Sequence, residues 1–161
     1  SVKENISINT LDTVSSWCGI SKRKETAKAE EIIKAYNVKT SNLNKEIKFL
    51  SGGNQQKVII GRSTCTEPKI LIFDEPTKGI DIGAKTEVYR LMKKLAENGI
   101  AIILISSEMD EIKKCANRII CMYHGEVTGE SDYGSEKEEI LKAILGIKTS
   151  SEEGKTDEQR A

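Results

Sequence analysis

The stretch Leu50–Val58, LSGGNQQKV, is the most informative part of the chain. It places a serine and two glycines directly before an amphipathic run, and the Ser51 hydroxyl can cap a helix by accepting a hydrogen bond from an amide one turn in. The amides of Gly52, Gly53 and Asn54 would then project from the helix start. Glycine lets an anion approach the backbone, and the helix dipole favours negative charge there. The stretch predicts a phosphate-recognising surface, although an ordinary capped helix after a glycine turn would use the same residues.

A second stretch, ILIFDEPTKGID at residues 70–81, removes much of that ambiguity. Its first four residues form a short apolar run, which predicts a strand buried on both faces. Asp74 and Glu75 then place two adjacent carboxylates at the carboxyl end of that strand. Open α/β sheets bind ligands at this edge, so we expect a functional site here rather than a merely solvated strand end.

Together the two stretches resemble the ATP-binding cassette (ABC) family of transport ATPases. LSGGNQQKV is similar to the family signature motif, and ILIFDEPTKGID is similar to its Walker B strand, catalytic glutamate and D-loop. The resemblance implies an α/β fold: a partial P-loop NTPase (RecA-like) core with an α-helical signature subdomain. We expect the helical subdomain at residues 1–67, the core at 68–148 and a disordered tail at 149–161, because that tail is polar and charged.

The resemblance also implies ATP and Mg²⁺ as ligands. By position, Asp74 supports the Mg²⁺ shell, through water, and Glu75 is the catalytic residue that polarises the attacking water. In this family two cassettes pack head to tail, so the signature residues of one meet the γ-phosphate held by the other. The residues expected to bind nucleotide in this way are Ser51, Gly52, Gly53 and Asn54.

Several positions qualify or depart from the family pattern. Asp81 resembles the D-loop aspartate that communicates across the cassette interface, and it is equally suited to cap a helix beginning at residue 82. Ser107 stands where many cassettes have a switch histidine, and the resemblance implies that Ser107 and Asp81 also belong to the nucleotide-binding residues. Because serine carries no positive charge, the usual γ-phosphate contact is weakened or supplied otherwise. Asn54 replaces the usual glutamine. The single histidine, His124, is expected to be a surface residue in a turn.

The remaining pattern alternates helices and strands, as expected of an α/β fold. We predict helices at 22–36, 51–66, 82–98, 109–115 and 136–145, and strands at 70–74, 101–105, 118–123 and 126–130. The order strand, helix, strand at 70–105 is a βαβ unit, so its two strands should be parallel. The last two strands, separated by His124 and Gly125, should form a hairpin.

No GxxxxGK[ST] phosphate loop occurs in the 161 residues. The chain begins at Ser1 without a methionine, as expected of a fragment. It resembles the C-terminal two-thirds of the second cassette of two-cassette monosaccharide importers, of the galactose/methyl-galactoside or ribose type. In the family, the phosphate-loop strand lies between the strands expected here at 101–105 and 118–123. We therefore expect a gap in the sheet, and little ATP hydrolysis by these residues alone.

Composition narrows the class of protein further. Lys plus Arg and Asp plus Glu both number 25, so the net charge gives no argument for nucleic-acid binding. The four cysteines show no CxxC spacing and three of them lie among apolar residues, which predicts buried free thiols in a cytosolic protein rather than disulfides or a zinc site. No apolar run approaches the roughly 20 residues of a membrane span, and no signal-peptide pattern opens the chain.

The leading hypothesis is the ATP-hydrolysing subunit of a bacterial ABC sugar importer, peripheral at the cytoplasmic face of the membrane. Its partners would be a second nucleotide-binding cassette, membrane permease subunits and, indirectly, a sugar-binding protein. One alternative is a repair or ribosome-associated cassette ATPase, against which the absence of a basic face argues. Another is a non-catalytic regulatory or structural cassette domain with a degenerate ATP site, which Ser107 favours and the Asp74–Glu75 pair opposes.

Overall fold

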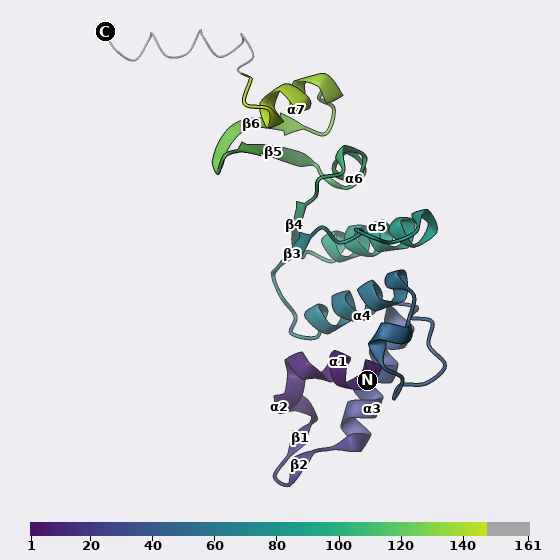
Figure 1. The fold of residues 1–161 in the computed structure, drawn as a ribbon. Helices are drawn as coiled ribbons and strands as arrows, with labels where there is room; N and C mark the ends of the chain where they lie inside the picture. Colours follow the sequence, from purple (N-terminus) through teal and green to yellow (C-terminus); the bar gives the residue numbers. More distant parts are fainter. Residues whose placement is uncertain (148–161) are drawn as a thin grey trace, which may run out of the picture. The chain divides into compact units, whose positions relative to one another are not determined.

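A computed structural model describes residues 1–147 of the protein, which divide into two compact units (Figure 1). The first comprises Ser1–Ser106, and the second begins at Ser107. The tail expected to be disordered, residues 149–161, lies outside the described residues, and the domain boundary expected at residue 67 stays a prediction.

The first half of unit 1 is helical. Ser1 begins the chain with a capping box, in which its hydroxyl accepts from the Glu4 amide and the Glu4 carboxylate accepts from the Ser1 amino group. Ser21 caps the next long helix through the Lys24 amide. In chain order the elements are α1 (Val2–Ser7), η1 (Ile8–Thr10), α2 (Leu11–Val14), β1 (Ser15–Ser16), β2 (Gly19–Ile20), α3 (Lys22–Ala35), η2 (Ile47–Phe49) and α4 (Gly52–Thr64). The predicted helices at 22–36 and 51–66 are confirmed, whereas η1, α2 and the short hairpin had not been predicted.

Helices α1, α3 and α4 share one apolar core. Its fully buried members are Val2, Ile6, Ala29, Ile32, Val38, Leu50 and Val58. Helix α4 approaches α3 closely at Gly61, where an added Cβ would lie 2.4 Å from Cγ2 of Ile32. A second tie is polar: the buried Glu25 pairs with Lys3 at 3.1 Å and accepts a hydrogen bond from the Ser7 hydroxyl. These contacts hold α4, and therefore the signature stretch at its start, on a packed base.

The second half of unit 1 is the predicted βαβ unit. Strands β3 (Ile70–Asp74) and β4 (Ala101–Ile105) pair in parallel, with Asp74 opposite Ile105, and α5 (Ile82–Glu97) connects them. Helix α5 buries Val88, Met92 and Leu95.

The expectation that β3 is buried on both faces is wrong. Phe73 is only 7% exposed, but the opposite face of the two-stranded sheet is open. The side chains on this face are aligned by the register and are about half exposed or more: Ile70, Ile72, Ile103 and Ile105. The apolar run of β3 is therefore buried on one face only, and no element within unit 1 covers the other face.

Unit 2 is a hairpin packed against two helices. Strands β5 (Arg118–Tyr123) and β6 (Glu126–Asp132) pair antiparallel, with an irregularity between Cys121 and Met122. Helices α6 (Met109–Cys115) and α7 (Lys137–Ile144) pack against the hairpin, where Ile140 of α7 forms a buried cluster with Ile119 and Cys121 of β5. His124 and Gly125 both have positive φ, 48° and 84°, as a tight hairpin turn requires, and His124 is exposed as predicted. Strands β4 and β5 belong to separate sheets, as the missing phosphate-loop strand predicts.

The cysteines are free thiols, but the expectation that they are buried holds only for Cys121. Cys18 is exposed, Cys65 and Cys115 are half-buried, and Cys121 is buried. Burial raises the pKa of the Cys65 and Cys121 thiols and raises the pKa of Cys115 to about 11. Because the thiolate is the nucleophile, these three thiols are poorly reactive near neutral pH.

We therefore expect iodoacetamide at mildly alkaline pH to alkylate Cys18 well before the other three cysteines. Peptide mass spectrometry over a time course measures the order. In a Cys18→Ser variant the fast phase should disappear while the slow phases remain. A fast phase at Cys121 would contradict the described packing of unit 2.

Candidate functional site

The signature stretch begins α4 with Ser51 in the N-cap position, but the hydroxyl does not cap the helix as predicted. Instead, the Asn54 side-chain amide donates to Ser51 Oγ at 2.8 Å. Asn54 Oδ1 in turn accepts from the Lys39 amide at 2.7 Å. The capping expectation is wrong because Asn54, one turn into the helix, is held by the preceding loop and occupies the acceptor site of the serine oxygen.

This arrangement leaves two kinds of donor at the exposed start of α4. Since Ser51 Oγ accepts from Asn54, its own proton remains available to a third group. The first-turn amides also have no side-chain cap, and helix N-terminal amides left in this state attract anions. Ser51 and Gly52 are exposed, so an anion can reach them.

Gly53 serves a packing purpose that the sequence did not reveal. It is buried, and a Cβ added there would lie 2.5 Å from Cβ of Ala84 in α5. At Gly52 the nearest atoms would be Ile80 Cγ1 at 3.7 Å and the Gly79 carbonyl oxygen at 3.8 Å, which are ordinary contacts. The start of the signature helix thus lies directly against the D-loop turn and the helix that follows it.

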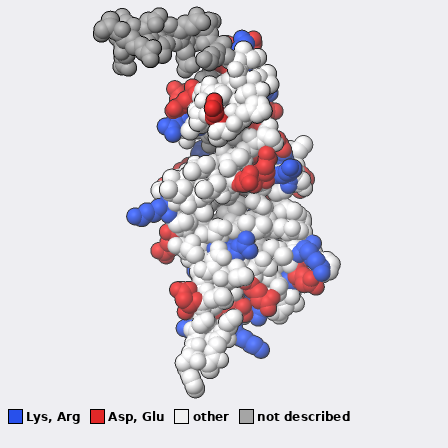
Figure 2. Space-filling view, turned by 60° about the vertical axis from the view of Figure 1, so that its left-hand side comes forward, with Lys and Arg blue, Asp and Glu red and all other residues white. Residues whose placement is uncertain are grey.

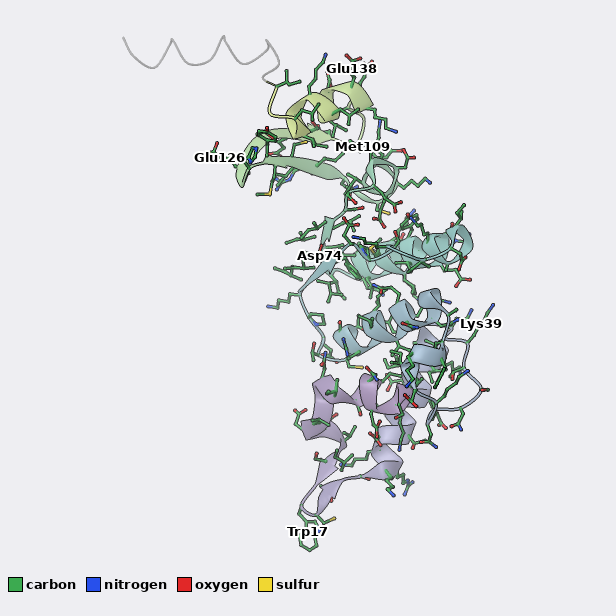
Figure 3. All side chains as sticks on the ribbon, viewed as in Figure 1. Trp17, Lys39, Asp74, Met109, Glu126 and Glu138 are labelled. Atoms are coloured by element: carbon green, nitrogen blue, oxygen red, sulfur yellow. The ribbon has the colours of Figure 1, made fainter. Side chains whose placement is uncertain are left out.

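The strand-end carboxylates occupy the position that the sequence predicts. Asp74 is the last residue of β3 and is exposed, and Glu75 follows at intermediate exposure (Figure 3 labels Asp74). Glu75 has φ of 46°, a left-handed conformation that is uncommon for a residue with a side chain. Its amide donates to the Ile105 carbonyl at 2.9 Å, which fixes the residue although its conformation is strained. Residues held in such a conformation by their surroundings are enriched at functional sites.

Asp81 closes the turn after Glu75. Its Oδ1 accepts from the Ala84 amide at 2.9 Å, which confirms the predicted cap of α5. Gly79, with φ of 73°, permits the turn between them. The D-loop role of Asp81 remains a prediction, as does the γ-phosphate role of Ser107, an exposed residue that begins unit 2.

Lys57 lies in the helix that begins at the candidate site, and the sequence pattern did not predict its burial. Its side chain is only 4% exposed, although lysine is normally solvated, and Nζ contacts the Asn37 carbonyl oxygen at 3.0 Å and the Glu87 carboxylate at 2.5 Å. The hydrogen bond and charge of Lys57 lower the pKa of Glu87. A lysine at the eighth position of a nine-residue signature stretch was the only sequence signal, and it does not identify a partner 30 residues away.

The candidate site is an exposed surface rather than an enclosed cavity. A hollow of about 150 Å³ between α4 and β3 reaches Asp74, but apolar side chains line much of it. Ligand pockets for small molecules typically measure about 300–1,000 Å³, so this hollow does not enclose a nucleotide. Residues 1–147 also contain no group of three or more His, Cys, Asp or Glu side chains that could hold a metal ion.

Comparisons with known proteins give a family match and several relatives. Residues 1–78 match the model of the ABC transporter family. A ribose import ATP-binding protein of Caldanaerobacter subterraneus subsp. tengcongensis is 45% identical over 148 residues, covering 90% of this chain and 30% of that protein. A Rhizobium meliloti protein named for ribose, galactose and methyl galactoside import is 54% identical over 113 residues, covering 70% of this chain and 22% of that protein.

The solved structures that resemble the chain are ATP-binding cassettes. One is a dimeric cassette in a post-hydrolysis state with ADP and Pi (TM-score 0.69, 25% identity, 84% of this chain and 58% of that one). Another is an inward-facing metal-chelate type ABC transporter (TM-score 0.75, 20% identity, 90% of this chain and 57% of that one), and its likeness concerns the fold alone.

The fold is that of a partial P-loop NTPase-like cassette. The family match covers residues 1–78, and the curated relatives named above are sugar import ATP-binding proteins. The chain spans less than a third of the length of these relatives.

Gly53→Ala should destabilise the protein by about 1–3 kcal/mol, because the new methyl group overlaps Ala84. Urea unfolding measures the change. Gly52→Ala, at an ordinary contact distance, is the matched control and should change stability little. The double variant Gly53→Ala with Ala84→Gly should recover most of the loss, and a strictly additive double variant would contradict the contact.

Glu87→Gln should lower the free energy of unfolding by about 1 kcal/mol at neutral pH, since Glu87 is partly exposed and solvent screens the pair. The folded pKa of Glu87 is lowered, so its contribution is complete above the unfolded pKa and is lost as pH falls through the folded pKa. The difference between wild type and variant should therefore shrink in acid. Glu97→Gln, at the end of the same helix, is the control, and an undiminished difference in acid would argue against the ion pair.

Proposed function

We propose that the chain is part of the ATP-hydrolysing subunit of a bacterial ABC importer for a monosaccharide of the ribose or galactose class. The observation that carries the proposal is one compact unit with two complementary surfaces: an uncapped signature helix and a strand end with two carboxylates. The names of the relatives support the substrate class.

The two surfaces suit different parts of a bound triphosphate. Ser51 can donate its hydroxyl proton to a phosphate oxygen because Asn54 supplies the hydrogen bond that its oxygen accepts. The amides of Gly52 and Gly53 add to the positive end of the helix. We assign these donors to a nucleotide held by a second cassette.

The carboxylates suit the nucleotide of their own cassette. Asp74 offers a hard oxygen at the strand end, and Glu75 is placed to accept a proton from water, held in a fixed backbone conformation. The donor set fits Mg²⁺ only in company with phosphate, because no three-carboxylate cage occurs in the described residues. When bound, Mg²⁺ supplies charge neutralisation to the phosphates.

The remaining assignments follow from this proposal. The second cassette and membrane permease subunits would be direct partners, and a sugar-binding protein would act through the permease. The location would be peripheral, at the cytoplasmic face of the membrane; no helix among residues 1–147 is long and apolar enough to cross a bilayer. The 161 residues contain no GxxxxGK[ST], so we expect this chain alone to hydrolyse little ATP.

Glu75→Gln in the longer protein that includes a phosphate loop should reduce ATP turnover by about 100-fold or more, the contribution typical of a general base, while ATP binding persists. Phosphate release and nucleotide affinity measure the two effects. Glu97→Gln is the control, because that side chain is exposed at the far end of α5. Unchanged turnover in Glu75→Gln would leave the regulatory alternative in place, and this site would not be the working one.

A further inference from the structure

The β1–β2 hairpin carries the most exposed large apolar side chain in the described part of the chain. Trp17 is 99% exposed at the hairpin end, and Ile20 on the return strand is 52% exposed. Figure 3 shows Trp17 at the end of the hairpin, pointing away from the helices α1 to α3 of its own unit. Leaving a tryptophan in water forfeits the burial of its large apolar surface, so such exposure indicates a surface that is covered in use.

A basic cluster follows the hairpin directly. Lys22, Arg23 and Lys24 fill the first turn of α3, and all three are exposed. Cations are disfavoured at this end of a helix because the dipole is positive there. Glu25, the acidic residue of the same turn, is buried and bound to Lys3 and Ser7. It is therefore not paired with the three exposed cations.

Few acidic groups neutralise the positive charge of this cluster. Lys24 Nζ contacts only the Ser15 carbonyl oxygen, at 3.5 Å, and within residues 1–147 neither Lys22 nor Arg23 forms an ion pair. Residues 11–24 hold these three cations and a single carboxylate, Asp12. The hairpin itself, residues 15–20, carries no charged side chain, and the three cations follow it directly in the chain. Figure 2 shows an uncharged tip at this end of the unit with basic side chains behind it.

We propose that this hairpin and the first turn of α3 bind the surface of an anionic phospholipid bilayer, with Trp17 at headgroup depth and the three cations on lipid phosphates. Tryptophan is favoured at the membrane–water interface, and each lysine or arginine near an anionic leaflet adds attraction. A protein partner fits less well, because a specific interface needs about 800 Å² per side and a narrow projecting hairpin does not offer a face of that size. The inference does not depend on the nucleotide site.

The chain contains its own reporter, because Trp17 is its single tryptophan. The test titrates the 161-residue protein with vesicles of phosphatidylcholine alone and of phosphatidylcholine mixed equally with phosphatidylglycerol, and follows tryptophan emission and quenching by brominated acyl chains. We expect a blue shift and quenching with the mixed vesicles only. Raising the salt from about 0.1 M to about 1 M, which shortens the screening length from about 10 Å to about 3 Å, should reverse both.

The charge contribution is tested by substitution. The triple variant Lys22→Gln, Arg23→Gln, Lys24→Gln should weaken partitioning by about 100-fold, from roughly fivefold for each cation. The matched control removes three other exposed lysines of unit 1, Lys69, Lys93 and Lys94, and should partition almost as wild type does. Equal losses in the two variants would overturn the assignment to this cluster.

Three other outcomes would also overturn it. One is emission that does not change with either vesicle, which would leave a protein partner as the occupant of the hairpin. Another is co-sedimentation with vesicles without any change in Trp17 emission. It would place the contact elsewhere, for example on the open face of strands β3 and β4. The last is a blue shift that grows with protein concentration in the absence of vesicles, which would indicate a second copy of the chain.

Discussion

The close contact between α4 and α5 is the constraint on which the candidate site depends. Gly53 lets the signature helix lie against Ala84, and the buried Lys57 pairs across the same boundary with Glu87. A buried ammonium is costly unless it is paired, so the pair specifies one arrangement of the two helices more than it adds stability. The two contacts join the helical half of unit 1 to its βαβ half.

The packing of α4 against α5 also brings the two parts of the candidate site together. The donors at the start of α4 are packed against the turn from Glu75 to Asp81, because Ile80 and Ala84 lie against Gly52 and Gly53. Under the proposed function, a cassette would present these donors to one nucleotide and its carboxylates to another.

The sequence predicted the elements that have a strong local signal. The βαβ unit, the hairpin turn at His124–Gly125 and the α5 cap at Asp81 are present where the apolar runs and turn residues placed them. Prediction from the sequence failed where the conformation of a residue depends on a partner distant in the chain. Ser51 is a good cap by itself, but the loop amide of Lys39 orients Asn54 onto it, and no local pattern contains that contact. The strained φ of Glu75 and the burial of Lys57 were invisible for the same reason.

The two exposed apolar features of unit 1 differ in kind, and the difference indicates what each is for. The open face of β3 and β4 is flat, aliphatic and aligned by strand register, as expected of a surface that packs against further protein. The hairpin end is narrow, carries one amphipathic ring and is backed by cations that the helix dipole disfavours. A folded protein core would not keep those charges beside it, because they would lose their water. An interface between lipid and water retains their solvation and still covers the ring.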